Sequence, residues 1–273
     1  MVTIYQDYND EPEDIFLPLP EELACAFYAL EMDSYTADTD FFEPLLPRHG
    51  TFLELGCGTG RIARKLVGPG GPSAPSRLVI GIDISIPMLQ LAARNQQPSR
   101  RSLSYLCMDM VQLAFSIKFD AILIPYNTLN LLGSQDKINQ CLNGCREFLQ
   151  PGGKLLVQLF VPSEEFIRQN KTFQFQMFDR PGGGKIIKEI LKQYEPQSQL
   201  VLIEERFRVR PMQEGEAKED WNKNYTIAGF SADQWLSLFT TAGFTPTNIH
   251  GDYSGSHYHQ STSSTLLLSL TLK

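Results

Sequence analysis

The sequence predicts an α/β fold whose core is a doubly wound, mostly parallel sheet of seven strands, interrupted by a β-rich insertion. From about residue 51, short apolar runs alternate with segments of helical period. Strands that are apolar throughout and separated by helices are typical of a parallel sheet covered on both faces. The alternation stops over residues 163–229, and the chain ends in two strands, at 244–251 and 264–272, with no helix between them. This final pair should be antiparallel, because a parallel connection needs a longer crossover.

Five strands are expected ahead of the insertion, at residues 51–55, 78–82, 103–108, 119–124 and 154–160. A helix should follow the first strand at 60–67, and three later helices each have a serine able to cap the first turn. These serines are Ser85, Ser134 and Ser231, the last forming a capping box with Gln234. The Pro-Gly-Gly sequence at 151–153 should turn the chain into the fifth strand.

The insertion at 163–229 is expected to hold antiparallel strands at 173–178, 185–194 and 200–209, joined by turns. The middle segment also fits a helical period, but its position between two turns of hairpin character favours a strand. Residues 1–45 are expected to form a helical cap ahead of the core, and the whole chain, 1–273, a single domain. The insertion is rich in aromatic residues, which fits either part of a lid over a site or packing onto the core or a dimer partner.

Composition narrows the class of protein. The formal net charge is −7, without the basic excess that a protein needs to hold nucleic acid through its phosphates. The five cysteines include no CxxC pair, so no metal site is predicted. Neither a signal-peptide pattern nor an apolar run long enough to span a membrane is evident. We therefore expect a cytoplasmic protein that binds neither nucleic acid nor membrane, with a homodimer among the partners considered.

The strongest functional signal is the segment Glu54-Leu-Gly-Cys-Gly-Thr-Gly60, which follows the first buried strand and opens a helix. Three glycines in seven residues let the backbone turn tightly and let a ligand approach closely. Free N–H groups at the start of the helix can then hold an anionic group. A dinucleotide-binding loop would need its third glycine one residue later, where this chain has Arg61, so a nicotinamide-dependent dehydrogenase is disfavoured.

This segment resembles motif I of the class I methyltransferases that use S-adenosylmethionine (SAM). The resemblance covers roughly residues 50–160 and implies that the loop cradles the amino-acid end of SAM, with Glu54 supporting the loop. Asp83 ends the second strand, where a carboxylate can accept both ribose hydroxyls of a nucleoside lying across the strand ends. It resembles the second SAM-binding acid of the family. The alternative is that Asp83 only caps the helix that begins beside Ser85.

In the same family, an acid at the end of the third strand lies against the adenine amino group. Asp109 occupies that place, and Met108 and Met110 suit packing on the ring, although a loop acid without such a role is the alternative. The resemblance thus implies a set of cofactor-binding residues: Glu54, Gly56, Cys57, Gly58, Gly60, Asp83, Ile84, Met88, Asp109 and Met110.

Three residues are candidates for a catalytic role. Tyr126 and Asn127 follow the fourth strand, a position that borders the methyl donor in the family, and the alternative is that they only shape the pocket floor. Tyr35 precedes motif I and resembles a tyrosine that closes over the cofactor in small-molecule methyltransferases, with simple packing as the alternative. The methyl group arrives already activated on a sulfonium, so alignment and exclusion of water matter more than any single side chain.

The expected function is transfer of a methyl group from SAM to a nucleophilic N, O or C of a small molecule, leaving S-adenosylhomocysteine. In the resembled family, the segments that correspond to 1–45 and 163–229 usually select the substrate. Two alternatives remain open. One is a methyltransferase acting on protein or tRNA, which the charge of −7 does not favour. The other is a SAM-binding protein without transferase activity.

Overall fold

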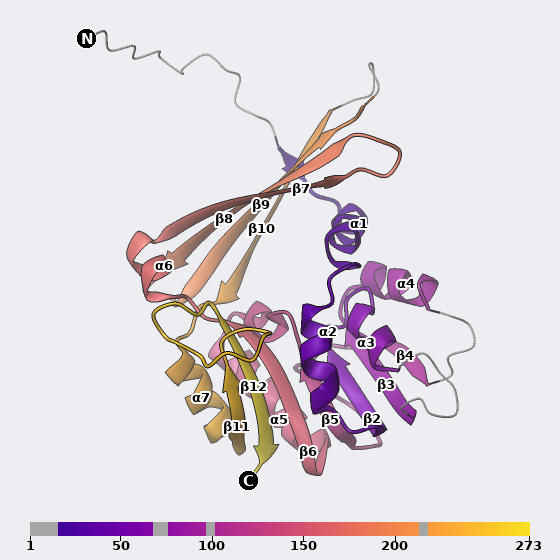
Figure 1. Ribbon diagram of the computed structural model, residues 1–273, viewed down its shortest axis with the longest axis vertical. Helices are drawn as coiled ribbons and strands as arrows, with labels where there is room; N and C mark the ends of the chain where they lie inside the picture. The colour runs from indigo at the N-terminus through magenta and orange to yellow at the C-terminus, as the bar shows by residue number, and fades with distance from the viewer. Residues whose placement is uncertain (1–15, 68–75, 97–101, 213–217) are drawn as a thin grey trace.

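The computed structural model describes residues 16–67, 76–96, 102–212 and 218–273, and it contains two sheets (Figure 1). The larger sheet has seven strands and lies with its helices in one half of the molecule. The smaller sheet has five strands and lies in the other half of the molecule, above the seven-stranded sheet in Figure 1. In the described part of the chain, no helix is long and apolar enough to cross a membrane.

The seven-stranded sheet has the predicted architecture. Its order is β11 (Phe244–His250), β12 (Thr265–Leu272), β6 (Leu149–Phe160), β5 (Phe119–Ile124), β2 (His49–Leu55), β3 (Ser76–Asp83) and β4 (Leu103–Cys107). Strands β6, β5, β2, β3 and β4 are parallel, and β12 runs antiparallel to both of its neighbours. Leu53, Leu55, Ile122 and Leu156 in the central strands are fully buried, because helices cover both faces of the sheet.

The helices that flank this sheet begin where the sequence predicts. They are α3 (Arg61–Leu66), α4 (Ile86–Arg94), α5 (Gln135–Phe148) and α7 (Ala232–Thr241). The Ser85 hydroxyl accepts a hydrogen bond from the Met88 amide (3.3 Å), and the Ser134 hydroxyl accepts one from Lys137 (3.4 Å). Ser231 and Gln234 form the reciprocal capping box ahead of α7.

One predicted turn is wrong. The Pro-Gly-Gly sequence at 151–153 lies inside β6, which already begins at Leu149. Pairing with β5 shifts along this stretch, since Phe119 pairs with Leu149 but Ala121 pairs with Lys154. The extra residues form an irregularity in which Gly152 has a φ of 81°, so the chain continues as a distorted strand where a turn was expected.

The smaller sheet confirms the three strands predicted in the insertion, including the ambiguous middle one. Its order is β1 (Leu17–Pro18), β10 (Glu219–Ala228), β9 (Leu200–Arg210), β8 (Lys185–Glu195) and β7 (Lys171–Asp179). Strand β10 and the short helix α6 (Glu164–Gln169) were not predicted from the sequence. Strand β10 escapes detection because its first eight residues, Glu-Asp-Trp-Asn-Lys-Asn-Tyr-Thr, are mostly polar, although all ten pair with β9.

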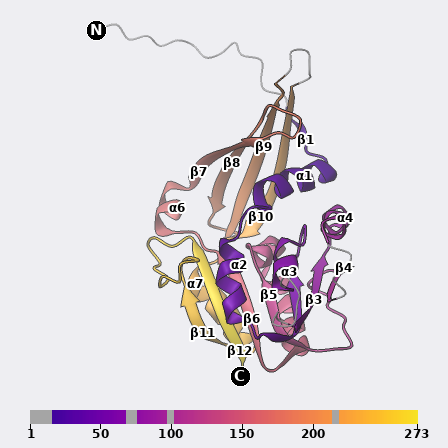
Figure 2. The same cartoon turned by 45° about the vertical axis from the view of Figure 1, so that its right-hand side comes forward.

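A helical cap was predicted over residues 1–45, of which 1–15 lie outside the described residues. The rest of this segment contains α1 (Glu21–Met32), α2 (Ala37–Phe42) and the 3-10 turn η1 (Glu43–Leu45). Helix α1 lies beneath the five-stranded sheet, where Phe27 stacks on Phe207 at 5.1 Å between ring centroids (Figure 2). Helix α2 packs instead on the seven-stranded sheet, with Phe42 next to Phe52 in one buried cluster. The segment therefore bridges the two sheets.

Candidate active site

A cavity of about 480 Å³ lies at the carboxyl ends of β2, β3 and β5. This is the edge at which open α/β sheets bind ligands, and the volume suits a small molecule. Three parts of the chain enclose it. The loops that follow the strands form one wall, α1 contributes Glu21, Cys25 and Tyr28 to another, and Lys223 reaches it from β10.

The three motif glycines all have positive φ: 68° at Gly56, 52° at Gly58 and 71° at Gly60. They differ in what a side chain at each position would contact. A Cβ on Gly56 would collide with the Thr128 side chain, and a Cβ on Gly60 with the Tyr105 hydroxyl. A Cβ on Gly58 would instead project toward open space, with Tyr28 at 3.8 Å and Met88 at 4.0 Å as its nearest neighbours. Only at Gly58 does the missing side chain leave the loop open to a ligand in the cavity.

Asp83 fastens this loop to the end of β3. Its Oδ2 accepts a hydrogen bond from the Gly58 amide (2.8 Å), and its Oδ1 accepts one from the Ser85 amide (2.9 Å). The carboxylate therefore braces both the glycine loop and the start of α4, while it still lines the cavity. Each carboxylate oxygen can accept a further hydrogen bond, so bracing does not prevent ligand binding.

Asp109 lies one strand further along the same edge. Its Oδ1 accepts a hydrogen bond from the Val111 amide (3.0 Å), which orders the turn after β4. Asp109 lines the cavity together with Met108 and Met110. Ile84, from the β3–α4 connection, and Met88, from the first turn of α4, also line the cavity and add apolar surface to it.

Glu54 is a buried acid at the base of the loop. The side chain is 2% exposed and lines the cavity, and within the described residues its Oε2 has no hydrogen-bond partner. Burial raises the pKa of the carboxyl to about 8, against the opposing effects of Arg61 and the Ala63 backbone. An unpartnered carboxyl oxygen in a cavity is costly, so this site favours a ligand that donates a hydrogen bond or carries positive charge.

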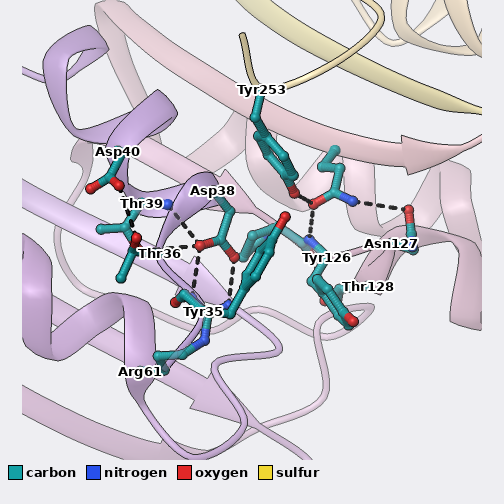
Figure 3. A network of polar contacts seen from close by, with 12 residues as sticks. Tyr35, Thr36, Asp38, Thr39, Asp40, Arg61, Tyr126, Asn127, Thr128 and Tyr253 are labelled. Carbon is teal, nitrogen blue, oxygen red and sulfur yellow. Dashed lines mark hydrogen bonds and ion pairs between the residues drawn. The ribbon is translucent and has the colours of Figure 1, made fainter. Parts of the chain in front are cut away.

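Arg61, which follows the glycine loop directly and was not predicted as a site residue, anchors the N-terminal segment to this site (Figure 3). Its guanidinium makes two hydrogen bonds to the fully buried Asp38 carboxylate (2.7 and 2.5 Å) and donates to the Tyr35 carbonyl (2.7 Å). Asp38 also accepts from the Thr39 amide at 2.7 Å. A buried bidentate pair of this kind fixes α2 against the glycine loop.

A second polar network holds the loop after β5 (Figure 3). Gln158 of β6 accepts a hydrogen bond from the Tyr126 amide (2.8 Å) and another from the Tyr253 hydroxyl, and it donates to the Asn127 side chain (3.4 Å). Tyr126 and Asn127 both have positive φ, of 50° and 60°. Non-glycine residues hold this conformation only where their surroundings enforce it, and Gln158 supplies the enforcing contacts.

Four tyrosines form a cluster of rings, of which Tyr28 and Tyr126 line the cavity. The ring of Tyr126 lies 6.3 Å from that of Tyr28 and 6.5 Å from that of Tyr35, which in turn lies 6.2 Å from Tyr253. Burial raises the pKa of Tyr28 to about 12 and also raises that of Tyr126, with the charge of Glu31 adding to the latter shift. These phenols therefore keep their protons at neutral pH.

Among the described residues, three of the predicted site residues do not line the cavity: Tyr35, Asn127 and Gly60. Tyr35 contacts the cavity wall through the Tyr126 ring, and the Asn127 amide is directed toward Gln158. The other predicted residues do line it: Glu54, Gly56, Cys57, Gly58, Asp83, Ile84, Met88, Asp109, Met110 and Tyr126.

Comparison with known proteins agrees with this geometry. Residues 52–153 match the model of a methyltransferase domain. A Bacillus subtilis protein named "Putative methyltransferase YqeM" is 26% identical over 224 residues, covering 81% of this chain and 83% of the relative. Residues 52–153 are therefore a methyltransferase domain, and the comparisons identify the chain as a SAM-dependent methyltransferase.

Solved methyltransferases share the fold of the whole chain. A SAM-dependent methyltransferase from Clostridium acetobutylicum superposes with a TM-score of 0.72 at 18% identity, over 92% of this methyltransferase and 98% of that one. The sugar N-methyltransferase KedS8 from Streptoalloteichus superposes with a TM-score of 0.67 at 14% identity, over 100% and 99% of the two chains. The likeness thus includes the five-stranded sheet as well as the motif-bearing core.

Several residues that shape the site of this methyltransferase carry no local signal in the sequence. Asp38 and Arg61 are 23 residues apart, and Gln158 and Tyr253 are 95 apart. Tyr28 and Lys223 come from α1 and β10, outside the matched domain, yet both line the cavity. A buried charged residue such as Arg61 needs a partner, which is the one clue that sequence reading could have used.

Proposed function

We propose that this methyltransferase transfers the methyl group of SAM to an amino nitrogen of a small-molecule acceptor, such as an amino sugar. The observation that carries the choice of nitrogen is the environment around Tyr28 and Tyr126. Both rings are protonated phenols, and the acid whose charge acts on Tyr126, Glu31, is already held by Lys188 at 2.8 Å. No histidine is among the described residues that line the cavity.

The residues of the cavity suit SAM as the cofactor. Gly58 leaves room for close approach, and Glu54 offers an unpartnered oxygen to a cationic donor such as the ammonium of the amino-acid end. Asp83 and Asp109 are proposed to accept hydrogen bonds from the ribose and adenine parts, with Met88, Met108 and Met110 as apolar walls. When bound, SAM supplies a methyl group that is already activated on a positively charged sulfur.

The acceptor end of the cavity is proposed to lie between the tyrosines and the five-stranded sheet. A neutral amine can attack without prior loss of a proton, whereas a hydroxyl needs a base to take its proton. The phenols of Tyr28 and Tyr126 can accept or donate a hydrogen bond, but at neutral pH they are poor bases. Transfer to nitrogen also keeps one positive charge in the site, and the aromatic faces stabilise such a charge.

Helix α1 and strand β10 are proposed to form the cover of this acceptor site. Both line the same cavity as the glycine loop, through Tyr28 and Lys223. A small-molecule acceptor bound there would be separated from bulk water on the side of the five-stranded sheet. The sugar N-methyltransferase KedS8, which has the same two-sheet fold, supports an acceptor of this chemical class.

The test compares matched acceptors that differ at one position. Purified protein is incubated with methyl-labelled SAM and pairs of nucleotide-linked sugars carrying either an amino or a hydroxyl group at the same carbon, and products are identified by mass. We expect methylation of at least one amino sugar and of none of its hydroxyl counterparts. An O-methylated product, or an intact SAM-binding protein that methylates no amine in the panel, would contradict the proposal.

A further inference from the structure

The outer edge of the five-stranded sheet carries an exposed apolar row. Phe173, Phe175 and Met177 alternate along β7 and are 61%, 69% and 59% exposed. Alternate residues of a strand project from the same face, so these three side chains lie side by side. Strand β7 is the last strand in the order of the sheet, and among the described strands it pairs only with β8. It forms the left margin of this sheet in Figure 2.

The two edges of this sheet differ in how they are protected. At the opposite edge, β1 has only two residues, Leu17 and Pro18, and a proline cannot extend the ladder of hydrogen bonds. Strand β7 has nine residues, Lys171–Asp179, with no proline. A long, apolar and unpaired edge is a site for pairing with another strand.

The sequence of β7 is complementary to itself when it is reversed. If two copies run antiparallel about Phe175, Lys171 faces Asp179, Phe173 faces Met177, and Phe175 faces its own copy. Gln174 then faces Gln176 on the other side of the strand. The apolar face would hold six large side chains in a row with an opposite-charge pair at each end, the arrangement that stabilises cross-strand pairing. The Asp179 side chain is 87% exposed, so its contact with Lys185 leaves it accessible.

We infer that β7 is the dimer interface of this methyltransferase, and that its occupant is β7 of a second copy. The two strands pair antiparallel about a two-fold axis at Phe175, which joins two five-stranded sheets into one of ten strands. Such an interface is isologous, because the same patch contributes from both copies. The inference does not depend on the identity of the methyl acceptor.

The first test measures the oligomeric state by sedimentation velocity over a range of protein concentrations. Wild-type protein should be a dimer, and Phe175→Lys should raise the dissociation constant at least tenfold, because it places two like charges at the axis. The control, Leu202→Lys, changes an exposed apolar residue (42%) on β9 of the same sheet and should leave the dimer unchanged. A wild-type monomer at every concentration, or disruption by Leu202→Lys alone, would overturn the inference.

The second test fixes the register by cross-linking, in a background where the exposed Cys107 is replaced by serine. Phe175→Cys should give a disulfide-linked dimer, because directly opposite residues have Cα atoms about 5 Å apart. Phe173→Cys should not, because its copy would lie four residues along the strand, about 13 Å away. Retained SAM binding shows that each variant is folded. A dimer that cross-links through residue 173 but not 175 would contradict this pairing.

Discussion

The two sheets of this methyltransferase differ in how completely their strands are buried. In the seven-stranded sheet, Leu53, Ile122 and Leu156 are fully buried, and neighbouring strands deliver the site residues at one edge. In the five-stranded sheet, buried inner residues such as Ile186 and Val201 alternate with half-exposed or exposed ones, and β7 exposes a whole apolar row. The first sheet is a rigid support for a cofactor loop. The second is the sheet to which we assign the cover of the acceptor site and the dimer interface.

Buried charge holds α1 against the five-stranded sheet. Lys188 of β8 lies 2.8 Å from Glu31 of α1 and 2.9 Å from Glu205 of β9, and the Tyr225 hydroxyl donates to Glu205 at 3.3 Å. The glycine loop at the cavity is held mainly by backbone geometry, whereas α1 is held to the five-stranded sheet by side-chain ion pairs. Substitutions in the glycine loop should therefore weaken SAM binding, whereas substitutions in the ion pairs should destabilise α1 and the five-stranded sheet.

The largest effect is expected at the cofactor loop. Gly58→Val should abolish SAM binding, more than 100-fold weaker by calorimetry, because the new side chain occupies the open approach and strains a residue with φ of 52°. Gly152→Ala is the matched control: its φ is 81° and no atom lies within 4 Å of an added Cβ, so it carries backbone strain far from the cavity. If Gly58→Val binds SAM as the wild type does, ligand approach does not occur at Gly58.

The next largest effect is expected where α1 packs on the five-stranded sheet. Lys188→Met removes a buried cation from between Glu31 and Glu205, whose side chains are 16% and 12% exposed, and breaking a buried pair of this kind typically costs up to about 3–5 kcal/mol. Hydrogen exchange should show lost protection in α1 and β8–β10 but not in β2–β5. Lys185→Met, on the same strand, removes an exposed pair with Asp179 and should cost little. Equal loss of protection in both sheets would show that they do not respond separately.

A smaller effect is expected at Asp83. Asp83→Ala removes the acceptor of two backbone amides and the proposed ribose contact, so SAM binding should weaken about 10- to 100-fold while the fold persists. Asp83→Asn keeps one acceptor oxygen and should give an intermediate affinity. Calorimetry with a parallel thermal melt separates the two roles. Unchanged affinity in a folded Asp83→Ala protein would mean that this acid only braces the loop.

The smallest effect is expected from the titration of Glu54. Its pKa of about 8 in the folded protein lies above the ordinary carboxyl value, so the group is protonated at neutral pH. The stabilising contribution of this proton is complete below the unfolded pKa and is lost as pH rises through 8. A cationic ligand favours the ionised form of Glu54, so SAM binding should lower the pKa of this carboxyl. The affinity for SAM should then rise as pH increases toward 8. The total rise is about tenfold for each unit by which binding lowers the pKa of Glu54.

Glu54→Gln is the control for this titration, because it retains the shape of the protonated acid. The variant should release fewer protons on binding SAM, measured by calorimetry in buffers of different ionisation enthalpy. It should also gain stability relative to the wild type as pH rises from 5 to 9. Identical proton release by the wild type and the variant would show that Glu54 does not contact SAM.

Much of the cofactor half could be predicted because its signals are local. The apolar strands, the serine caps and the segment from Glu54 to Gly60 each act within a few residues, and parallel topology then brings Asp83 and Asp109 to the same edge. The distortion at 151–153 was missed because a Pro-Gly-Gly sequence signals a turn, whereas pairing with β5 kept it in the strand. The polar strand β10 was missed because pairing with β9, which its own pattern does not reveal, made it a strand.

The sequence by itself therefore determined the buried parallel sheet, the glycine loop and the acids at the strand ends, because backbone conformation and burial period are properties of short segments. The tertiary structure alone decided that Arg61 pairs with Asp38, that Gln158 holds Tyr126 and Tyr253, and that α1 and β10 face the same cavity. Those contacts join residues far apart in the chain. Each depends on mutual burial, which removes water and leaves a polar group to find the one partner within reach.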